Sequence, residues 1–439
     1  MKNVQAACCR LGYVTLIALA ITVPVHASSR SHGDGASEAN PVSMTPSVAQ
    51  EAVLATVSSV EAIRGLEFKR PVTVQVVDDA AVRKHAIERL NGFYTEEQLR
   101  AQQAVYTLLG LVPEGTDILE EYFEVMEEQA GGFYDPSKKS FFLLDDMPAG
   151  MAPILAAHEL THALEDQHFD LDQRVKEVFP DEDRVFARSA VHEGSAMLVM
   201  SLYLAGAMAD GTLSGDDLQA MGETEAMRGK KLSAMPAALR RPLLAVYFLG
   251  LNFLGRGDPT SFASGFPQGD VDLCYREGPL SSEQILHPEK FWDPALRDDP
   301  TPVDLGKAGR SLGRGWHREE TGVMGELILG VLVGAPTPSG PEDVSRSVLG
   351  GGGWSNAPSA GWDGDRWEIW SRGDSQVVLL KTVWDSPEDA EEFGAALESR
   401  PGLTWKVRGN VLALVAGDAE EKVEAVLEAL LGEPRRRKT

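Results

Sequence analysis

The chain has 439 residues, which is long enough for two domains that each bury a core. With 43% hydrophobic residues it has the composition of an ordinary globular protein, which excludes a disordered or fibrous one. The formal net charge of -25 disfavours nucleic acid and anionic membrane surfaces as partners, because both carry negative charge themselves.

The first 27 residues have the pattern of an export signal. A short basic region precedes the apolar residues 11–23, and residues 25–27 (VHA) are typical of a cleavage site. We therefore expect an exported protein, periplasmic or secreted, that is cleaved after residue 27; the alternative is an uncleaved membrane anchor. Cleavage would leave Cys274 as the single cysteine, so no internal disulfide could form, and we interpret it as a buried small residue.

The next segments alternate between helical and strand-like patterns. Residues 28–47 are rich in Ser and Gly and predict a flexible leader. The predicted strands are residues 71–77 and 140–144, residues 131–136 (GGFYDP) predict a chain break, and the predicted helices include residues 96–109, 117–130, 153–167 and 182–209. Two apolar runs, residues 197–208 and 243–254, are shorter than the roughly 20 residues of a membrane span. We expect core helices there, and no membrane association after cleavage.

A stretch rich in Gly, Pro and Ser at residues 334–359 predicts a linker between a first domain, residues 48–333, and a second, residues 360–432. In the second domain the pattern predicts strands at residues 366–371, 376–384, 403–407 and 411–415 and helices at residues 386–399 and 419–431. The predicted fold class is therefore α+β, with a helix-rich domain that holds a small sheet, followed by a small ββαββα domain. The second domain shows no pattern of catalytic residues.

The residues with the clearest chemical meaning are His158, Glu159 and His162, which form an H-E-x-x-H pattern in an apolar helix. Residues four apart project from one face of a helix, so both imidazoles can reach one zinc ion at about 2.0–2.1 Å. Glu159 lies about 100° around the helix, where it could take a proton from a metal-bound water. The strand predicted at residues 140–144 comes just before, where zinc peptidases place the edge strand that pairs with an extended substrate.

A catalytic zinc usually has three protein ligands and an open position for water. His168 is in register with the metzincin pattern, but that pattern needs a glycine where this chain has Glu165, and an unbroken helix would turn His168 away. Glu193 lies in the next strong helix, and a carboxylate on a second helix packed against the first can complete such a site. We favour Glu193 as the third ligand, with His168 and the adjacent His192 as alternatives.

Residues 158–167 (HELTHALEDQ), together with residues 193–196 (EGSA), resemble the gluzincin-type zinc metallopeptidases of the MA clan. The resemblance is closest to a group of exported bacterial proteins with an H-E-L-x-H-A-L-x-D-Q pattern. Residues 281–290 (SSEQILHPEK) are similar to a further signature of that group, and the resemblance covers about residues 50–330. It implies a helix-rich zincin domain that binds Zn²⁺ through the two histidines and Glu193, with a peptide or protein as substrate.

The reaction also needs a hydrogen-bond donor for the negative charge that develops on the substrate oxygen. Tyr247 lies some tens of residues beyond Glu193, in a Y-x-x-G-x-x-F pattern that resembles the clan, and we predict that it is this donor. The alternative is a core tyrosine whose hydroxyl bonds to the backbone. Tyr203 and Tyr275 are further candidates. His287 precedes a proline, and we interpret it as part of a structural loop.

Two functions are consistent with these patterns. The first is a zinc-dependent metallopeptidase, in which Glu159 assists the attack of zinc-bound water on a peptide bond. The second is a catalytically silent binding or scaffold protein that retains zinc for its structure, a hypothesis motivated by the linker and by a second domain without catalytic residues. We predict the peptidase and keep the scaffold as the alternative.

Overall fold

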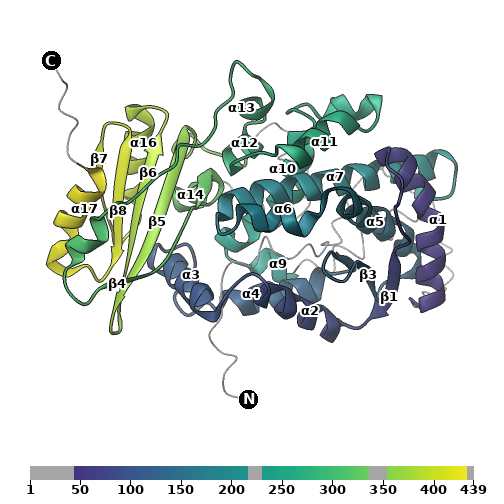
Figure 1. Ribbon diagram of the computed structural model, residues 1–439, viewed down its shortest axis with the longest axis horizontal. Helices are drawn as coiled ribbons and strands as arrows, with labels where there is room; N and C mark the ends of the chain where they lie inside the picture. The colour runs from purple at the N-terminus through teal and green to yellow at the C-terminus, as the bar shows by residue number, and fades with distance from the viewer. Residues whose placement is uncertain (1–43, 216–229, 336–352, 433–439) are drawn as a thin grey trace, which may run out of the picture.

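The computed structural model describes residues 44–215, 230–335 and 353–432 (Figure 1). The predicted signal segment and most of the predicted leader and linker lie outside these residues, so export and cleavage stay predictions. The helices up to residue 335 are α1 (Pro46–Arg64), α2 (Asp79–Asn91), α3 (Glu96–Leu108), α4 (Ile118–Gln129), α5 (Ala152–Phe169), α6 (Leu171–Val178), α7 (Glu182–Ala209), α9 (Lys230–Ala234), α10 (Ala237–Leu254), α11 (Gln268–Arg276), α12 (Ser282–Leu286), α13 (Glu289–Trp292) and α14 (Gly325–Leu332).

The α+β class is confirmed. Helices predominate, and the helix-rich part also holds a three-stranded sheet of β1 (Thr73–Val77), β2 (Gly132–Asp135) and β3 (Ser140–Leu144). A five-stranded antiparallel sheet forms the opposite end of the molecule from α1 and α5 (Figure 1). The helix-rich part with a small sheet and the sheet-rich part that follows it are thus both present.

The small sheet corrects the prediction about the edge strand. Its order is β1-β3-β2, so β3, which was predicted at the edge, is the central strand. It pairs in parallel with β1 and antiparallel with β2, and all five of its residues are buried. A continuous apolar run such as SFFLL is typical of a strand covered on both faces. The edge nearest α5 belongs instead to β2, in a segment where the sequence predicts only a chain break.

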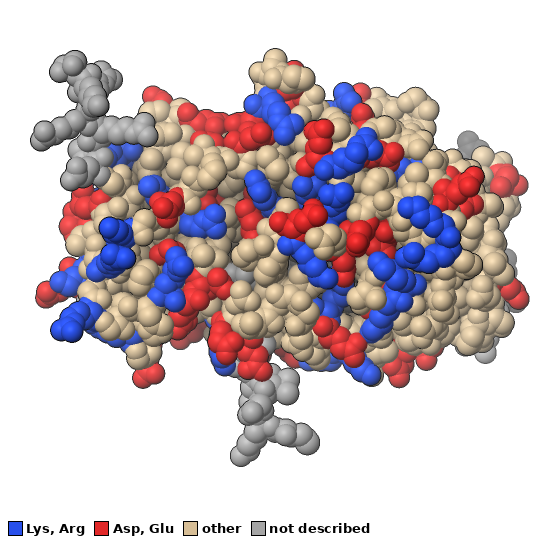
Figure 2. All heavy atoms as spheres, viewed as in Figure 1, with Lys and Arg blue, Asp and Glu red and all other residues tan. Residues whose placement is uncertain are grey.

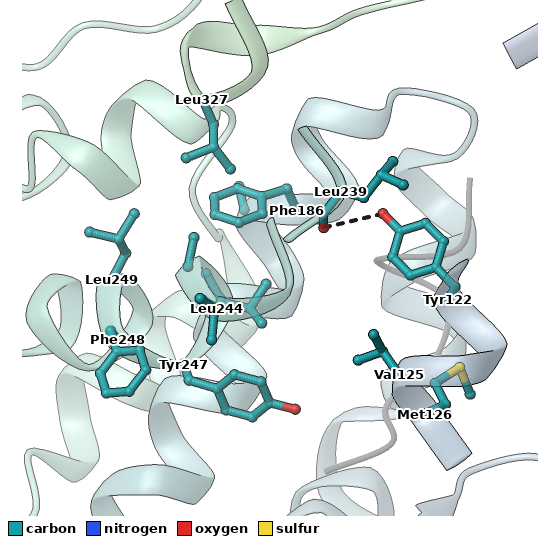
Figure 3. Close-up of a cluster of buried hydrophobic side chains, with 14 of the residues drawn as sticks. Tyr122, Val125, Met126, Phe186, Leu239, Leu244, Tyr247, Phe248, Leu249 and Leu327 are labelled. Atoms are coloured by element: carbon teal, nitrogen blue, oxygen red, sulfur yellow. Dashed lines mark hydrogen bonds between the residues drawn. The ribbon is translucent and has the colours of Figure 1, made fainter. Parts of the chain in front are cut away.

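Two glycines allow α7 and α10 to touch. A Cβ at Gly250 would lie 1.9 Å from the carbonyl oxygen of Ala190, and a Cβ at Gly194 would lie 2.4 Å from the backbone of Gly250. The two backbones are therefore in direct contact at this crossing, which any larger residue would prevent. Figure 3 shows buried side chains that α4, α7, α10 and α14 contribute to the core, among them Val125, Met126, Phe186, Leu244, Phe248, Leu249 and Leu327.

The apolar runs at residues 197–208 and 243–254 lie in helices, α7 and α10. The second run is a core segment as predicted, but residues 201–208 of α7 are half-buried or exposed apart from Ala207. Among the described residues, α10 is the one helix long and apolar enough to cross a membrane, but 72% of its most apolar window is buried inside the protein. It is thus a core helix in this fold. Cys274 is likewise buried, on α11.

The larger sheet contains β4 (His317–Gly322), β5 (Trp362–Arg372), β6 (Ser375–Trp384), β7 (Leu403–Arg408) and β8 (Val411–Gly417), with the helices α16 (Pro387–Leu397) and α17 (Val423–Leu431). From β5 onward the order is ββαββα, as predicted. The strand order is β4-β5-β6-β8-β7, so β4, which precedes the predicted linker, forms one edge of this sheet. The boundary predicted at residues 333–334 therefore does not separate the two parts, because the first range contributes a strand to the second.

The two faces of this sheet belong to two hydrophobic clusters. Val378 and Leu380 of β6 face the large core that continues into the helices, whereas Val377 and Leu379 face a smaller cluster. Residues 303–312 and α17 complete the smaller cluster. Successive residues of a strand point to opposite faces, which explains the division. The sheet thus lies between the two clusters. Its face with Val378 and Leu380 packs into the same core as the helices.

A cavity of about 240 Å³ lies where the N-terminus of α7 meets β5. Asp181, Asp183 and Asp365 line it together with Arg184 and Arg366. On the surface, Figure 2 shows acidic and basic side chains interspersed over the face in view. Acidic residues therefore do not form a continuous negative surface on that face, because basic residues lie between them.

Candidate metal centre

The structure brings the three predicted metal ligands together. His158 and His162 lie one turn apart on α5, and Glu193 reaches them from α7. The Nε2 atoms of the two histidines are 3.1 Å apart, and Glu193 Oε2 lies 3.1 Å from Nε2 of His158 and 3.4 Å from Nε2 of His162. All three residues are buried, with at most 3% of their surface exposed.

These separations fit a zinc ion. Ligand atoms at about 2.0–2.1 Å from zinc in a tetrahedral arrangement are roughly 3.3 Å from one another, close to the three distances found here. Two imidazole nitrogens and one carboxylate oxygen are also donors that zinc accepts. All three groups are good acceptors that converge in a buried space, where a cation would balance them. The residues present thus fit the metal that the resemblance implies.

Charges within the cluster move the pKa values of its members in opposite directions. Burial lowers the pKa of His162, but the charge and hydrogen bond of Glu193, together with the charges of Glu159 and Glu165, outweigh it and raise that pKa to about 9. Burial raises the pKa of Glu193, but the charge on His162 and hydrogen bonds from both imidazoles lower it to about 2. Glu165 adds to the negative potential at both imidazoles. The cluster therefore favours a positive charge beside Glu193, whether a proton or a metal ion carries it.

Glu159 is held by the edge strand β2. One carboxylate oxygen, Oε2, accepts a hydrogen bond of 2.6 Å from the backbone N–H of Tyr134. The other, Oε1, is buried and has no hydrogen-bond partner among the residues that the structure describes. Burial raises the pKa of Glu159 to about 8. A buried carboxylate with one oxygen fixed and the other unused is well arranged to take and return a proton.

The alternative ligands lie outside the cluster. α5 continues through Glu165 to Phe169, so His168 is turned away, and its Nε2 lies 2.9 Å from the carbonyl oxygen of Glu67. His192 is buried on α7, but its ring stacks on that of Tyr275 with a centroid separation of 5.3 Å. Neither belongs to the group of three donors that could hold one ion.

Tyr247 lies next to the cluster. Its buried ring is 6.2 Å from the His158 ring between centroids, and in Figure 3 its hydroxyl points from α10 toward α4. The α7–α10 contact places it there, because Tyr247 is one turn before Gly250. Tyr275, in contrast, donates its hydroxyl to Glu165 at 2.5 Å. Tyr203 is on α7, about 15 Å along the helix from Glu193.

Residues 281–290 connect neighbouring helices and strands through hydrogen bonds and ion pairs. The side chain of Ser282 accepts the N–H of Leu327 at 3.2 Å, and His287 Nε2 lies 3.1 Å from Glu326 Oε1, both on α14. Lys290 bonds three carboxylates, those of Glu283, Asp298 and Asp385, at 2.6, 2.8 and 3.0 Å. These carboxylates are close enough to hold a metal ion, but the Lys290 ammonium already lies among them. The segment connects α12 and α13 to α14 and to the end of β6.

The sequence does not predict two residues that take part in or adjoin the candidate metal centre. Tyr134 acts through its backbone N–H, and a backbone donor has no residue type that would reveal it. Glu165 carries no clear signal, because it begins the polar run Glu165-Asp166-Gln167, and the structure places it in a buried network with Ser195.

Comparison with known families gives a match for one part of the chain. A family model described as a domain of unknown function (DUF8575) matches residues 312–423, a range that contains β4 to β8 and none of the cluster residues. No curated protein and no solved structure matches the chain. The gluzincin resemblance of residues 158–167 therefore stays a prediction.

Proposed function

We propose that the protein is a zinc-dependent metallopeptidase. The observation that supports this most directly is the convergence of His158, His162 and Glu193 on one point, with Glu159 close by and one of its oxygens unused. Zinc, when bound by these three residues, supplies a Lewis acid that polarises a carbonyl group and lowers the pKa of water.

Glu159 is the proposed general base and acid. Its Oε1 would take the proton of the attacking water and pass it to the nitrogen of the leaving amine. The Tyr134 N–H holds Oε2, so the carboxylate keeps one orientation while the proton moves. Tyr247 would donate a hydrogen bond to the substrate oxygen as negative charge develops there.

The orientation of β2 supports a peptide substrate. The Tyr134 N–H points away from β3, toward Glu159, so the backbone groups of Gly132, two residues earlier, also face the outer edge. An extended peptide can pair with such an edge through its own backbone. A peptide bound there would run past the carboxylate of Glu159.

The first test combines metal analysis with a matched variant. We expect about one zinc per chain in the full-length protein and cleavage of an unbiased peptide library. Glu159→Gln keeps the shape of the side chain but removes the base, so we expect it to retain zinc and lose turnover by roughly 10³-fold. Glu193→Ala should lose zinc together with activity. Peptide cleavage by Glu159→Gln at the wild-type rate would refute the mechanism.

One observation favours the scaffold alternative. Glu159 has no exposed surface, and every residue of β2 is buried, as in a metal site that serves the fold alone. A chelator titration separates the two functions. A structural site would lose stability when the metal is removed, without any hydrolysis beforehand, whereas a peptidase loses hydrolysis in step with its metal.

A further inference from the structure

A buried ionic network lies directly behind the candidate metal centre. Its central residue is Glu165, one turn beyond His162 on α5, with no exposed surface. Glu165 Oε1 accepts hydrogen bonds from Arg64 Nε and from Ser195 Oγ, each at 2.6 Å. Its Oε2 accepts the hydroxyl of Tyr275 at 2.5 Å. One carboxylate thus joins α5 to α1, α7 and α11.

Two of these contacts act on the helix that carries Glu193. Ser195 is two residues beyond Glu193 on α7, and its hydroxyl ties that part of α7 to α5. The ring of Tyr275 lies between Phe169 of α5 and His192 of α7, with centroid separations of 4.6 and 5.3 Å. The network therefore contributes to the packing of α7 against α5, and the meeting of the three ligand atoms depends on that packing.

The network also carries excess negative charge. Arg64 pairs with Glu165 and with Asp272, whose carboxylate is 2.7 Å from its Nη2. One guanidinium thus serves two carboxylates. Charges in a buried, low-dielectric region act strongly on one another, so this excess favours a cation in the adjacent cluster.

We propose that Glu165 is a positioning residue of the metal centre, which sets its affinity for a divalent cation by fixing α7 against α5 and by supplying buried negative charge. This inference rests on the metal site of the proposed function, but it does not depend on peptide cleavage. Partners that orient metal ligands from outside the coordination sphere typically change metal affinity by about 10–100-fold.

The test compares the affinity of full-length variants for Zn²⁺, measured by competition with a chromophoric chelator. Glu165→Gln removes the charge, and we expect affinity to fall by about 10–100-fold. Ser195→Ala removes one hydroxyl donor, and we expect a loss of about tenfold. The absorption bands of the Co²⁺-loaded variants should shift from those of the wild type, because Glu193 is displaced.

Glu283→Gln is the matched control. Glu283 is also a fully buried glutamate in an ion pair of 2.6 Å, with Lys290 of α13. Its helix α12 meets α7 at Asp183, about 15 Å along that helix from Glu193. We expect it to lower the unfolding midpoint of the metal-free protein and leave the affinity for Zn²⁺ within about threefold of wild type.

The outcomes separate the two proposals. Wild-type affinity and an unchanged Co²⁺ spectrum in Glu165→Gln and Ser195→Ala would overturn the role of Glu165 alone. If Glu165→Gln does not fold, Ser195→Ala decides, since it leaves the Arg64 pair in place. A wild type that binds no metal would overturn both proposals. Metal binding that weakens as expected in a protein that cleaves no peptide would leave the role of Glu165 standing and remove the peptidase.

Discussion

The unused oxygen of Glu159 sets it apart from the other buried carboxylates of α5. Glu165 and Asp166 lie on the same helix and each accept three hydrogen bonds. Glu159 accepts one, from Tyr134. Unsatisfied buried oxygens are costly and rare in folded proteins, so such a position calls for a chemical explanation. Proton transfer to and from a substrate is the explanation that fits its neighbours.

Residue types and spacing predict much of this site. The four-residue interval of His158 and His162 places them on one helical face, and helix geometry alone turns His168 away. Glu193 is predicted because a carboxylate in the next helix can complete the ligand set. The sequence cannot show that the Tyr134 N–H holds Glu159, since this depends on where the backbone of β2 lies. Contacts between residues, unlike residue types, are visible only in the fold.

Tyr247→Phe tests the proposed hydrogen-bond donor. If the hydroxyl stabilises the developing negative charge, we expect kcat to fall by roughly 10²-fold with unchanged zinc content, because the ring still packs beside His158. The measurement is steady-state hydrolysis of a cleaved library peptide, with metal analysis alongside.

Tyr122→Phe provides the control for this substitution. Tyr122 is buried on α4, and its hydroxyl lies 3.5 Å from the carbonyl oxygen of Leu239 (Figure 3). We expect a small loss of stability, about 1 kcal/mol, and no change in kcat. Equal kcat in Tyr247→Phe and wild type would instead identify Tyr247 as a core tyrosine.

At the level of elements, strand identity is predicted better than strand pairing. β3 is predicted at residues 140–144, yet its neighbour β1 lies far upstream in the chain, and nothing local reveals that both its edges are paired. β4 is missed because His317–Gly322 is mostly charged, without apolar alternation, which suits an edge strand. The long apolar helices are recovered because their periodicity extends over several turns.

The α7–α10 crossing gives a prediction about packing. Gly250→Ala would place a methyl group on the carbonyl of Ala190, so the helices must separate, and Tyr247 would move with α10. We expect the free energy of unfolding to fall by about 3 kcal/mol, measured by urea denaturation, with a parallel loss of activity.

Gly206→Ala, on the partner helix α7, is the control. Apart from the adjacent residues and backbone of α7 itself, no atom of the described residues lies within 4 Å of a Cβ at Gly206. Alanine favours a helix over glycine by about 1 kcal/mol. We therefore expect this variant to be as stable as the wild type or slightly more so. Equal destabilisation by both substitutions would argue against a specific contact at Gly250.

Across the whole molecule, the helices and the larger sheet meet at buried carboxylates. Asp365 accepts the N–H groups of Met324 and Gly325 at 2.9 and 2.8 Å and the indole N–H of Trp362 at 3.1 Å. Burial raises the pKa of Asp365 to about 6, despite these donors. Burial also raises the pKa of the neighbouring Asp183, and the charges of Asp181 and Asp365 add to the effect. Both carboxylates line the cavity between α7 and β5.

This arrangement predicts a pH dependence of stability. The pKa of Asp365 is higher in the folded protein than its ordinary value of 3.8, so the protonated form favours folding. Its contribution is complete below about pH 4 and is lost as the pH rises through 6. We expect Asp365→Asn to flatten the fall in unfolding free energy between pH 4 and 7, measured by urea denaturation. The exposed Asp374→Asn serves as the control and should keep the wild-type slope.

Because β4 belongs to the larger sheet, the parts of the chain before and after residues 336–352 depend on each other for folding. Residues 303–322 come before the segment 336–352, yet they contribute an edge strand and part of the smaller hydrophobic cluster to the sheet formed after it. A chain cut at an inserted protease site near residue 345 should therefore behave as two complementing fragments. We expect them to elute together at the volume of the uncut protein in size-exclusion chromatography, and to part only in denaturant. Separate elution in native buffer would contradict this. Recombination within residues 336–352 would separate the C-terminal part from its edge strand, so a unit inherited whole would have to begin before β4.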